Sequence, residues 1–157
     1  MTKSTQKSEF SVAEPVRDIR FVSNTTRTVS YSIFYFVTRQ EHVQYWLSTA
    51  KHDFETAEAL FAAGRYDACL FFGHLMLEKA LKALWVMVRE EGFIPPKIHR
   101  LLRISLEAQV PLTQEQKAFL ELADGFHLET RYPDYRLSFY KLCTKDYSTE
   151  KFAKIKE

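Results

Sequence analysis

Residues 66–91 read YDACLFFGHLMLEKALKALWVMVREE. The run contains no Pro, its apolar residues cover a wide arc of a helix, and Gly92 follows it where a helix would end. A helix that is apolar over most of its circumference is buried inside a protein. We therefore expect residues 66–91 to form the central, most buried helix of the fold.

A second helical pattern precedes this run. Residues 44–63 carry apolar side chains at three- and four-residue spacing, which is typical of an amphipathic helix. Gly64 stands where the C-terminal cap of that helix is expected. The apolar positions are Trp46, Leu47, Ala50, Phe54, Ala57, Leu60 and Phe61.

Further helices are predicted after the central one. A short third helix, containing Leu101, Leu102 and Leu106, ends before Pro111. Thr113 and Gln116 have the spacing of a capping box and start a fourth helix. That helix is expected to stop near Arg131, because the residue before Pro133 is pushed out of the helical region. Residues 149–157 begin a fifth helix.

The composition agrees with an all-α fold. The chain has 157 residues, of which four are Gly and five are Pro, and this low share argues against a sandwich or barrel rich in turns. The loops between the predicted helices are short, so we expect an antiparallel bundle of four to five helices. No apolar run approaches the roughly 18 residues needed to span a membrane, and no membrane association is expected.

The cysteine content indicates the cellular location of the protein, and the charge limits the ligands that it can bind. Two cysteines, Cys69 and Cys143, are too few for a disulfide framework, so a reducing cytoplasmic location is expected. Residues 43–157 carry sixteen Lys and Arg against sixteen Asp and Glu. A neutral body argues against broad, non-specific binding of nucleic acid and leaves only local basic clusters.

The first 42 residues differ from the rest of the chain. They contain twelve Ser and Thr and no Leu, whereas residues 43–157 contain sixteen Leu. We expect residues 1–42 to form a disordered or weakly structured extension and residues 43–157 to form the helical domain. An alternative is that residues 1–42 lie upstream of the true start of the protein.

A polar stripe runs along the predicted central helix. His74, Glu78 and Lys82 are spaced at i, i+4 and i+8 and share one face, and Lys79 lies beside them. One interpretation is a core histidine with its partner, an intrahelical Glu–Lys pair and a solvated edge of the bundle. The other is a nucleotide- or phosphate-binding site or a self-association surface.

Two other polar groups have both a functional and a structural interpretation. His99 lies between Lys97 and Arg100 at the start of the third helix, where backbone N–H groups and cations together can hold a phosphate. It is equally well explained as a surface residue. Asp53 and Asp67 flank the turn at Arg65 and are expected to pair with it.

Residues 129–135, ETRYPDY, form the densest polar and aromatic patch of the chain. We expect a rigid turn at Pro133 that orients Arg131 and Tyr132. An Arg offers a bidentate fork for phosphate, and a Tyr offers a hydroxyl and a stacking face for a base. Alternatively, Arg131 pairs with Glu78 or with Glu129, and Tyr132 covers the core.

Three segments taken together resemble one known family. They are FETAEALFAAGRYDACLFFGHLMLEKALKAL (54–84), PPKIHRLLRI (95–104) and LETRYPDYR (128–136), and their order and separation resemble those of the HEPN domain of bacteria and archaea. The similarity covers about residues 43–156. It implies a helical bundle that forms a homodimer, and a minimal nucleotidyltransferase as partner, the pair acting as a toxin–antitoxin module or a nucleotide-handling complex.

The resemblance does not extend to a nuclease motif. Ribonucleases of the wider superfamily have a catalytic Arg followed, after four to six residues, by a His. Here eight residues separate Arg65 from His74, and no His follows Arg131. No phosphate-binding loop, nucleophile elbow, cofactor motif or metal-ligand set is present either. We therefore expect no catalysis by a well-marked mechanism, although His74 and Arg131 have the residue types for metal-independent RNA cleavage.

Three functional hypotheses follow. The first is a non-catalytic dimer that binds a nucleotide or phosphate and docks a nucleotidyltransferase. The second is an RNA-cleaving toxin with a rearranged site, and the third is a purely structural adaptor. Tyr132 or Tyr135 is a further candidate, as an acceptor of an adenylyl group from the partner. The last helix is short by the standard of the family, which predicts that Phe152 and Ile155, or the groove they fill, are exposed.

Overall fold

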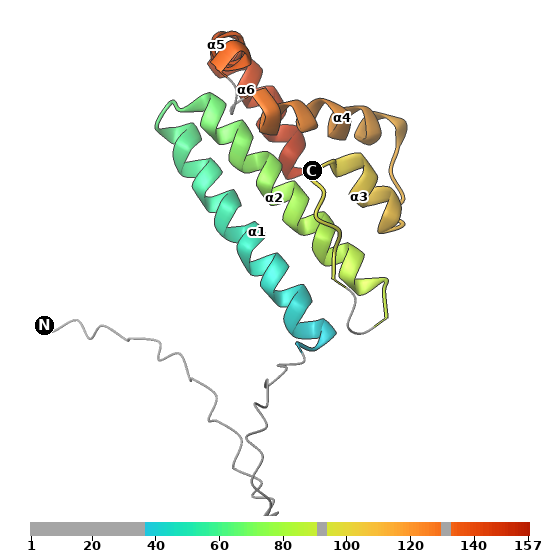
Figure 1. The fold of residues 1–157 in the computed structure, drawn as a ribbon. Helices are drawn as coiled ribbons and strands as arrows, with labels where there is room; N and C mark the ends of the chain where they lie inside the picture. The colour runs from blue at the N-terminus through green and yellow to red at the C-terminus, as the bar shows by residue number, and fades with distance from the viewer. Residues whose placement is uncertain (1–36, 91–93, 130–132) are drawn as a thin grey trace, which may run out of the picture. The chain divides into compact units, whose positions relative to one another are not determined.

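The computed structural model describes residues 37–90, 94–129 and 133–157, and within these ranges it does not describe the side chains of residues 128, 129 and 133–136 (Figure 1). The described residues form helices and no strand, which confirms the predicted all-α class. Their helices are α1 (Arg39–Ala62), α2 (Tyr66–Met87), α3 (Leu101–Glu107), α4 (Gln114–Glu129), α5 (Pro133–Leu142) and α6 (Lys145–Lys156).

Helix α2 is the centre of the bundle, as its apolar sequence predicts. It contacts each of the other five helices. Figure 1 shows α1 running antiparallel along one side of α2, while α3, α4 and α6 lie against its other side. Every other helix therefore packs against the same partner.

The packing against α2 is close at Gly73. A Cβ atom built on this residue would lie 2.6 Å from Cδ1 of Ile155, so the missing side chain lets α6 approach the central helix. Ile155 and Phe152 are themselves buried, and the rings of Phe54 and Phe61 stack on Phe152. The prediction that the short last helix leaves Phe152 and Ile155 exposed is wrong, because α1 and α2 cover both. An open cavity of about 450 Å³ does lie beside Ile155, between α2, α4 and the end of α6.

Helix α1 begins at Arg39, earlier than the apolar spacing from residue 44 predicts. A capping box sets this start: the Thr38 hydroxyl accepts a hydrogen bond from the Glu41 N–H at 3.2 Å, and the Thr38 N–H donates to the Glu41 carboxylate at 2.8 Å. The same device was predicted for α4, and there Thr113 and Gln116 bond reciprocally at 3.0 and 3.1 Å.

The C-terminal third contains a helix that the sequence did not predict. Helix α5 starts at Pro133, where a rigid turn was expected. A Pro ends the helix before it but is also well suited to the first position of a new helix, because its φ is already helical and it needs no N–H partner there. Helix α6 then starts at Lys145, not at residue 149, because the Thr144 hydroxyl caps it by accepting from the Tyr147 N–H.

Buried apolar side chains complete the core, and both cysteines are among them. Cys69 and Cys143 are free and buried. Burial raises the pKa of the Cys69 thiol to about 12, only partly opposed by the charge of Lys156, so the thiol stays protonated at neutral pH. Within the parts of the chain that are described, no helix is long and apolar enough to cross a membrane.

The turn between α1 and α2 depends on Gly64, as predicted. Its φ is +70°, a left-handed conformation that costs a residue with a Cβ atom about 1 kcal/mol or more. The turn is closed by two backbone hydrogen bonds, from Gly64 N–H to the Phe61 carbonyl at 3.0 Å and from Arg65 N–H to the Leu60 carbonyl at 2.8 Å. These bonds fix the point at which the two longest helices reverse direction.

We predict that Gly64→Ala lowers the free energy of unfolding by about 1 kcal/mol. No atom lies within 4 Å of the added Cβ, so the loss would come from backbone strain and not from a clash. Urea denaturation of the two proteins measures it. Gly64→Asn is the matched control and should lose less, because Asn tolerates positive φ. Equal stability of Gly64→Ala and the parent chain would contradict this account of the turn.

Candidate functional site

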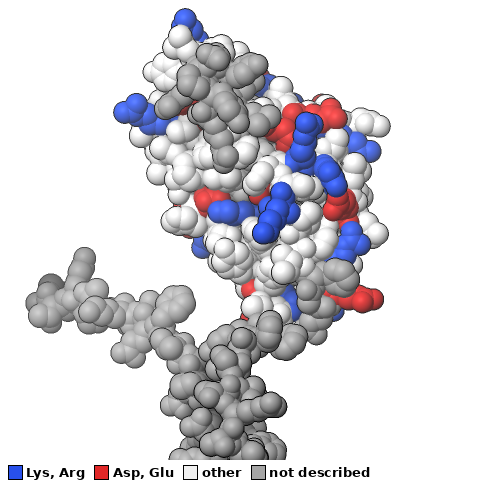
Figure 2. All heavy atoms as spheres, viewed as in Figure 1, with Lys and Arg blue, Asp and Glu red and all other residues white. Residues whose placement is uncertain are grey.

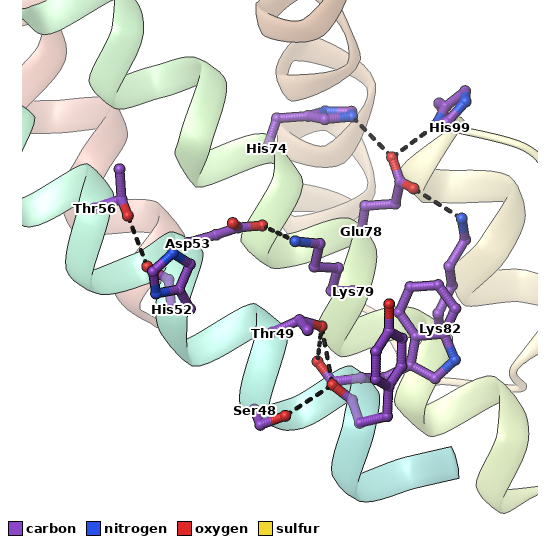
Figure 3. Close-up of polar contacts among 12 residues, drawn as sticks. Ser48, Thr49, His52, Asp53, Thr56, His74, Glu78, Lys79, Lys82 and His99 are labelled. Carbon is purple, nitrogen blue, oxygen red and sulfur yellow. Dashed lines mark hydrogen bonds and ion pairs between the residues drawn. The ribbon is translucent and has the colours of Figure 1, made fainter. Parts of the chain in front are cut away.

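Three side chains from α2 and the segment before α3 meet around the carboxylate of Glu78 (Figure 3). Glu78 accepts a hydrogen bond from Lys82 Nζ at 2.8 Å and lies 2.9 Å from His99 Nδ1 and 3.6 Å from His74 Nε2. We call Glu78, His74, Lys82 and His99 the Glu78 cluster. The predicted stripe on α2 therefore does form one polar group, and it recruits His99 from 21 residues further along the chain.

The cluster is almost entirely buried. His74 is 0% exposed, and Glu78 and Lys82 are each 6% exposed. Two parts of the structural interpretation are confirmed, because His74 is a core histidine with a partner and Glu78 pairs with Lys82 within the helix. The third part, a solvated edge of the bundle, is wrong. The side chain of His99, by contrast, is 57% exposed. Of the four members, His99 alone reaches the surface.

The tautomer of His74 follows from its partners. Its Nδ1 lies 3.0 Å from the Ala123 carbonyl oxygen of α4, which can only accept a hydrogen bond. Nδ1 therefore carries a proton, and Nε2 is the atom that faces Glu78. His74 thereby joins the cluster to α4, and its full burial keeps it away from any ligand in solution.

A third histidine, His127 of α4, connects the other two. Its ring stacks on His74 with a centroid distance of 4.9 Å and on His99 with a centroid distance of 5.0 Å. His127 is itself 5% exposed, and the ring of Phe71 stacks on it at 6.0 Å. His127 is not among the site residues predicted from the sequence. The signal for it was its position four residues after Ala123 on the apolar face of α4.

Glu78 is held in its charged form. Burial alone would raise the pKa of this carboxyl, but the contacts with His74, Lys82 and His99, together with the charge of Lys82, outweigh burial and lower the pKa to about 2. Lys82 also lies 5.3 Å from the ring centroid of Trp46 on α1, a cation–π distance. The buried charges of Glu78 and Lys82 thus compensate each other within α2, and the Trp46 ring of α1 packs against the lysine.

Lys79, predicted as part of the same site, has a different partner. It forms an ion pair with Asp53 of α1, and Asp53 is 4% exposed (Figure 3). The predicted pairing of Asp53 with Arg65 is therefore wrong. Arg65 is exposed at the end of the hairpin, whereas Asp53 faces α2 from the middle of α1. The Lys79–Asp53 pair fixes α1 against α2 and stands apart from the Glu78 cluster.

The predicted phosphate site at the start of α3 is taken by a side chain of the protein itself. The Leu101 N–H donates to the Asp124 carboxylate of α4 at 2.8 Å. Burial raises the pKa of Asp124, while the Leu101 bond and the charges of His74 and Arg100 oppose that change. His99 faces Glu78 and not this helix end, so the N-terminus of α3 binds Asp124 in place of an external anion.

Arg131 and Tyr132 lie outside the described residues, so the structure does not place them relative to the Glu78 cluster. The face of the domain seen in Figure 2 carries Lys and Arg interspersed with Asp and Glu and has no wide field of one sign. Among residues 37–90, 94–129 and 133–157, no group of three or more His, Cys, Asp or Glu is placed to hold a metal ion.

These features define an all-helical bundle with one buried acid, histidine and lysine cluster around its central helix. The chain belongs to the HEPN domain family, whose profile matches residues 43–156. Among solved structures, it is similar to the crystal structure of TT1696 from Thermus thermophilus, with a TM-score of 0.53 and 20% identity. The similarity covers 73% of this chain and 96% of the other, and at this identity it shows the fold alone. No curated protein matches the chain.

We predict that Glu78→Gln lowers the free energy of unfolding at pH 7 by about 3–5 kcal/mol, because it leaves the charge of Lys82 buried without a partner. Since the pKa of Glu78 in the folded chain, about 2, lies below its ordinary value of 4.5, its contribution is complete above pH 4.5 and is lost as the pH falls towards 2. The difference between the two proteins should therefore shrink over this range. Urea denaturation at a series of pH values measures it.

Glu55→Gln is the matched control for this experiment. Glu55 also pairs with a Lys one helical turn away, Lys51, but both side chains are exposed, at 59% and 77%. Its removal should change stability by less than about 1 kcal/mol at any pH. A loss at Glu78 no larger than the loss at Glu55 would show that the cluster does not behave as a buried charge network.

Proposed function

We propose that this HEPN module is a binding module that forms a homodimer, binds the phosphate of a nucleotide and docks a minimal nucleotidyltransferase as its partner in a cytoplasmic toxin–antitoxin pair. The membership of the family supports the partner and the dimer. The observation on which the binding site rests is the exposure of His99 at the surface end of an otherwise buried polar cluster.

In this proposal the predicted binding residues have two different roles. His74, Glu78 and Lys82 are buried and already paired, so in this proposal they hold His99 in position and do not contact the ligand. His99 is accessible, and Lys97 and Arg100, also exposed, flank it in the chain. Arg131 and Tyr132 are proposed to add a bidentate phosphate contact and a stacking face for the base.

Apolar side chains at the surface support docking of a protein. On α5, Leu137 and Tyr140 are each 61% exposed, although the neighbouring Phe139 is 2% exposed and anchors the helix to the core. An exposed apolar pair on one helix is suited to a contact with another subunit. We propose that this face of α5 takes part in the dimer or in binding of the nucleotidyltransferase.

The first test is binding of ATP and GTP to the full chain by isothermal titration calorimetry. We expect measurable binding that weakens by roughly tenfold or more in Arg131→Ala and in His99→Ala, because each loses a charge-assisted contact to phosphate. Arg103→Ala is the control, since Arg103 is exposed but pairs with Glu107 on α3. Unchanged affinity in both site variants would contradict the site, and no binding by the parent chain would favour the purely structural adaptor.

One observation favours RNA cleavage as a second candidate function. An imidazole is suited to take a proton from a ribose hydroxyl when one of its nitrogens is hydrogen-bonded to a carboxylate and the other faces solvent. In the structure His99 has this arrangement, whereas His74, the residue suggested by the sequence, is fully buried.

Incubation of labelled RNA with the full chain, without added metal, tests this candidate. If the chain is a nuclease, the parent cleaves, and His99→Gln and Arg131→Ala lower the rate by about 100-fold or more, the usual contribution of a general base. His52→Gln, a change at an exposed histidine of α1, should leave cleavage unaltered. Absence of cleavage by a folded parent chain would exclude the nuclease and leave the binding module.

A further inference from the structure

His99 differs chemically from the other histidines of the described chain that are not buried, the half-buried His42 and the exposed His52 of α1. Its Nδ1 lies 2.9 Å from a Glu78 oxygen. A charged carboxylate can only accept, so Nδ1 carries the proton and the lone pair of the neutral ring is on Nε2. Among the residues that the structure places, His42 and His52 have no carboxylate partner.

The lone pair on Nε2 also has a fixed direction. The ring of His99 stacks on His127 with a centroid distance of 5.0 Å and an interplanar angle of 19°, while the bond to Glu78 fixes its rotation. Nε2 is the ring nitrogen not used by Glu78, on a side chain that is 57% exposed. The other two rings of the stack are closed to reagents, because His74 is 0% and His127 is 5% exposed.

A carboxylate alone beside His99 would repel an incoming anion, but here positive charges accompany it. From α2, Glu78 faces the ring, but Lys82 bonds the same carboxylate at 2.8 Å and balances it. His74 of α2 and His127 of α4 are the other titratable groups of the stack, and Asp124 of α4 is bonded to Leu101. Two exposed positive charges, Lys97 and Arg100, lie within three residues of His99 in the chain.

We propose that His99 is a phosphoryl-acceptor site: its Nε2 takes a phosphoryl group from a small donor of the acyl-phosphate or phosphoramidate class, with Glu78 as the positioning residue. The inference goes beyond the proposed binding function and does not depend on a nucleotidyltransferase.

The proposed step is a simple substitution at phosphorus. The Nε2 lone pair forms a bond to phosphorus, and the bond from phosphorus to the leaving group breaks. With phosphoramidate, ammonia leaves with the electron pair of that bond. The modified ring is a cation that still carries its Nδ1 proton, and the Glu78 carboxylate stabilises this charge through the existing hydrogen bond. No redox partner or metal is needed.

The test is treatment of the folded full chain with potassium phosphoramidate, followed by peptide mapping under alkaline conditions, in which phosphohistidine is stable. We expect His99 to be labelled several-fold faster than His42 and His52, and the label to be on Nε2, which NMR distinguishes from Nδ1. In Glu78→Gln, labelling of His99 should fall to the rate of the other two histidines, whose rates should not change.

Two further measurements keep the result unambiguous if Glu78→Gln fails to fold. In the parent chain unfolded in urea, the three histidines should be labelled at similar rates, because the advantage of His99 comes from the fold. The identity of the labelled nitrogen needs no variant at all. Labelling of His99 no faster than the exposed His52 in the folded parent, or a label on its Nδ1, would overturn the proposal.

Discussion

The carboxylate of Glu78 is the constraint to which the rest of the structure responds. A charge in the middle of the most apolar helix is costly unless partners satisfy it, and the helix itself supplies only His74 and Lys82, one turn away on either side. The remaining partner, His99, comes from the segment before α3. The contact between Glu78 and His99 therefore fixes where the segment before α3 packs against α2, after the hairpin formed by α1 and α2.

The same interaction orders α4. His74 faces Glu78 through one nitrogen because the other bonds the Ala123 carbonyl, and His127, one turn further along α4, stacks on both His74 and His99. Asp124, which lies between Ala123 and His127 in the chain, caps α3 through Leu101. Helices α3 and α4 are thus tied to α2 by polar contacts in addition to apolar packing. Such contacts have direction, so they define a relative orientation that apolar surfaces alone leave less determined.

The features of this arrangement that could be predicted from the sequence are those that lie within a single helix. The apolar arc of α2 predicts its central position, and the i, i+4, i+8 spacing brings His74, Glu78 and Lys82 to one face. The partners of that face were not predictable, because helical periodicity carries no information about contacts over 21 or 49 residues. Asp53 was paired with Arg65 on closeness in sequence, yet it faces Lys79. Helix α5 was missed because Pro133 was interpreted only as the end of a helix.

Stability alone does not account for a buried cluster of this composition. Replacing a buried ion pair by well-packed apolar side chains is often neutral or stabilising, so α2 would hold the bundle together at least as well with leucines in these positions. An apolar replacement would not, however, orient a surface imidazole. Of the four side chains of the cluster, three are buried and the fourth, His99, is exposed with one ring nitrogen bonded and the ring plane fixed by stacking. We therefore interpret the cluster as a support for chemistry or binding at His99. Its buried side chains, in the core of this HEPN domain, hold that surface residue in position.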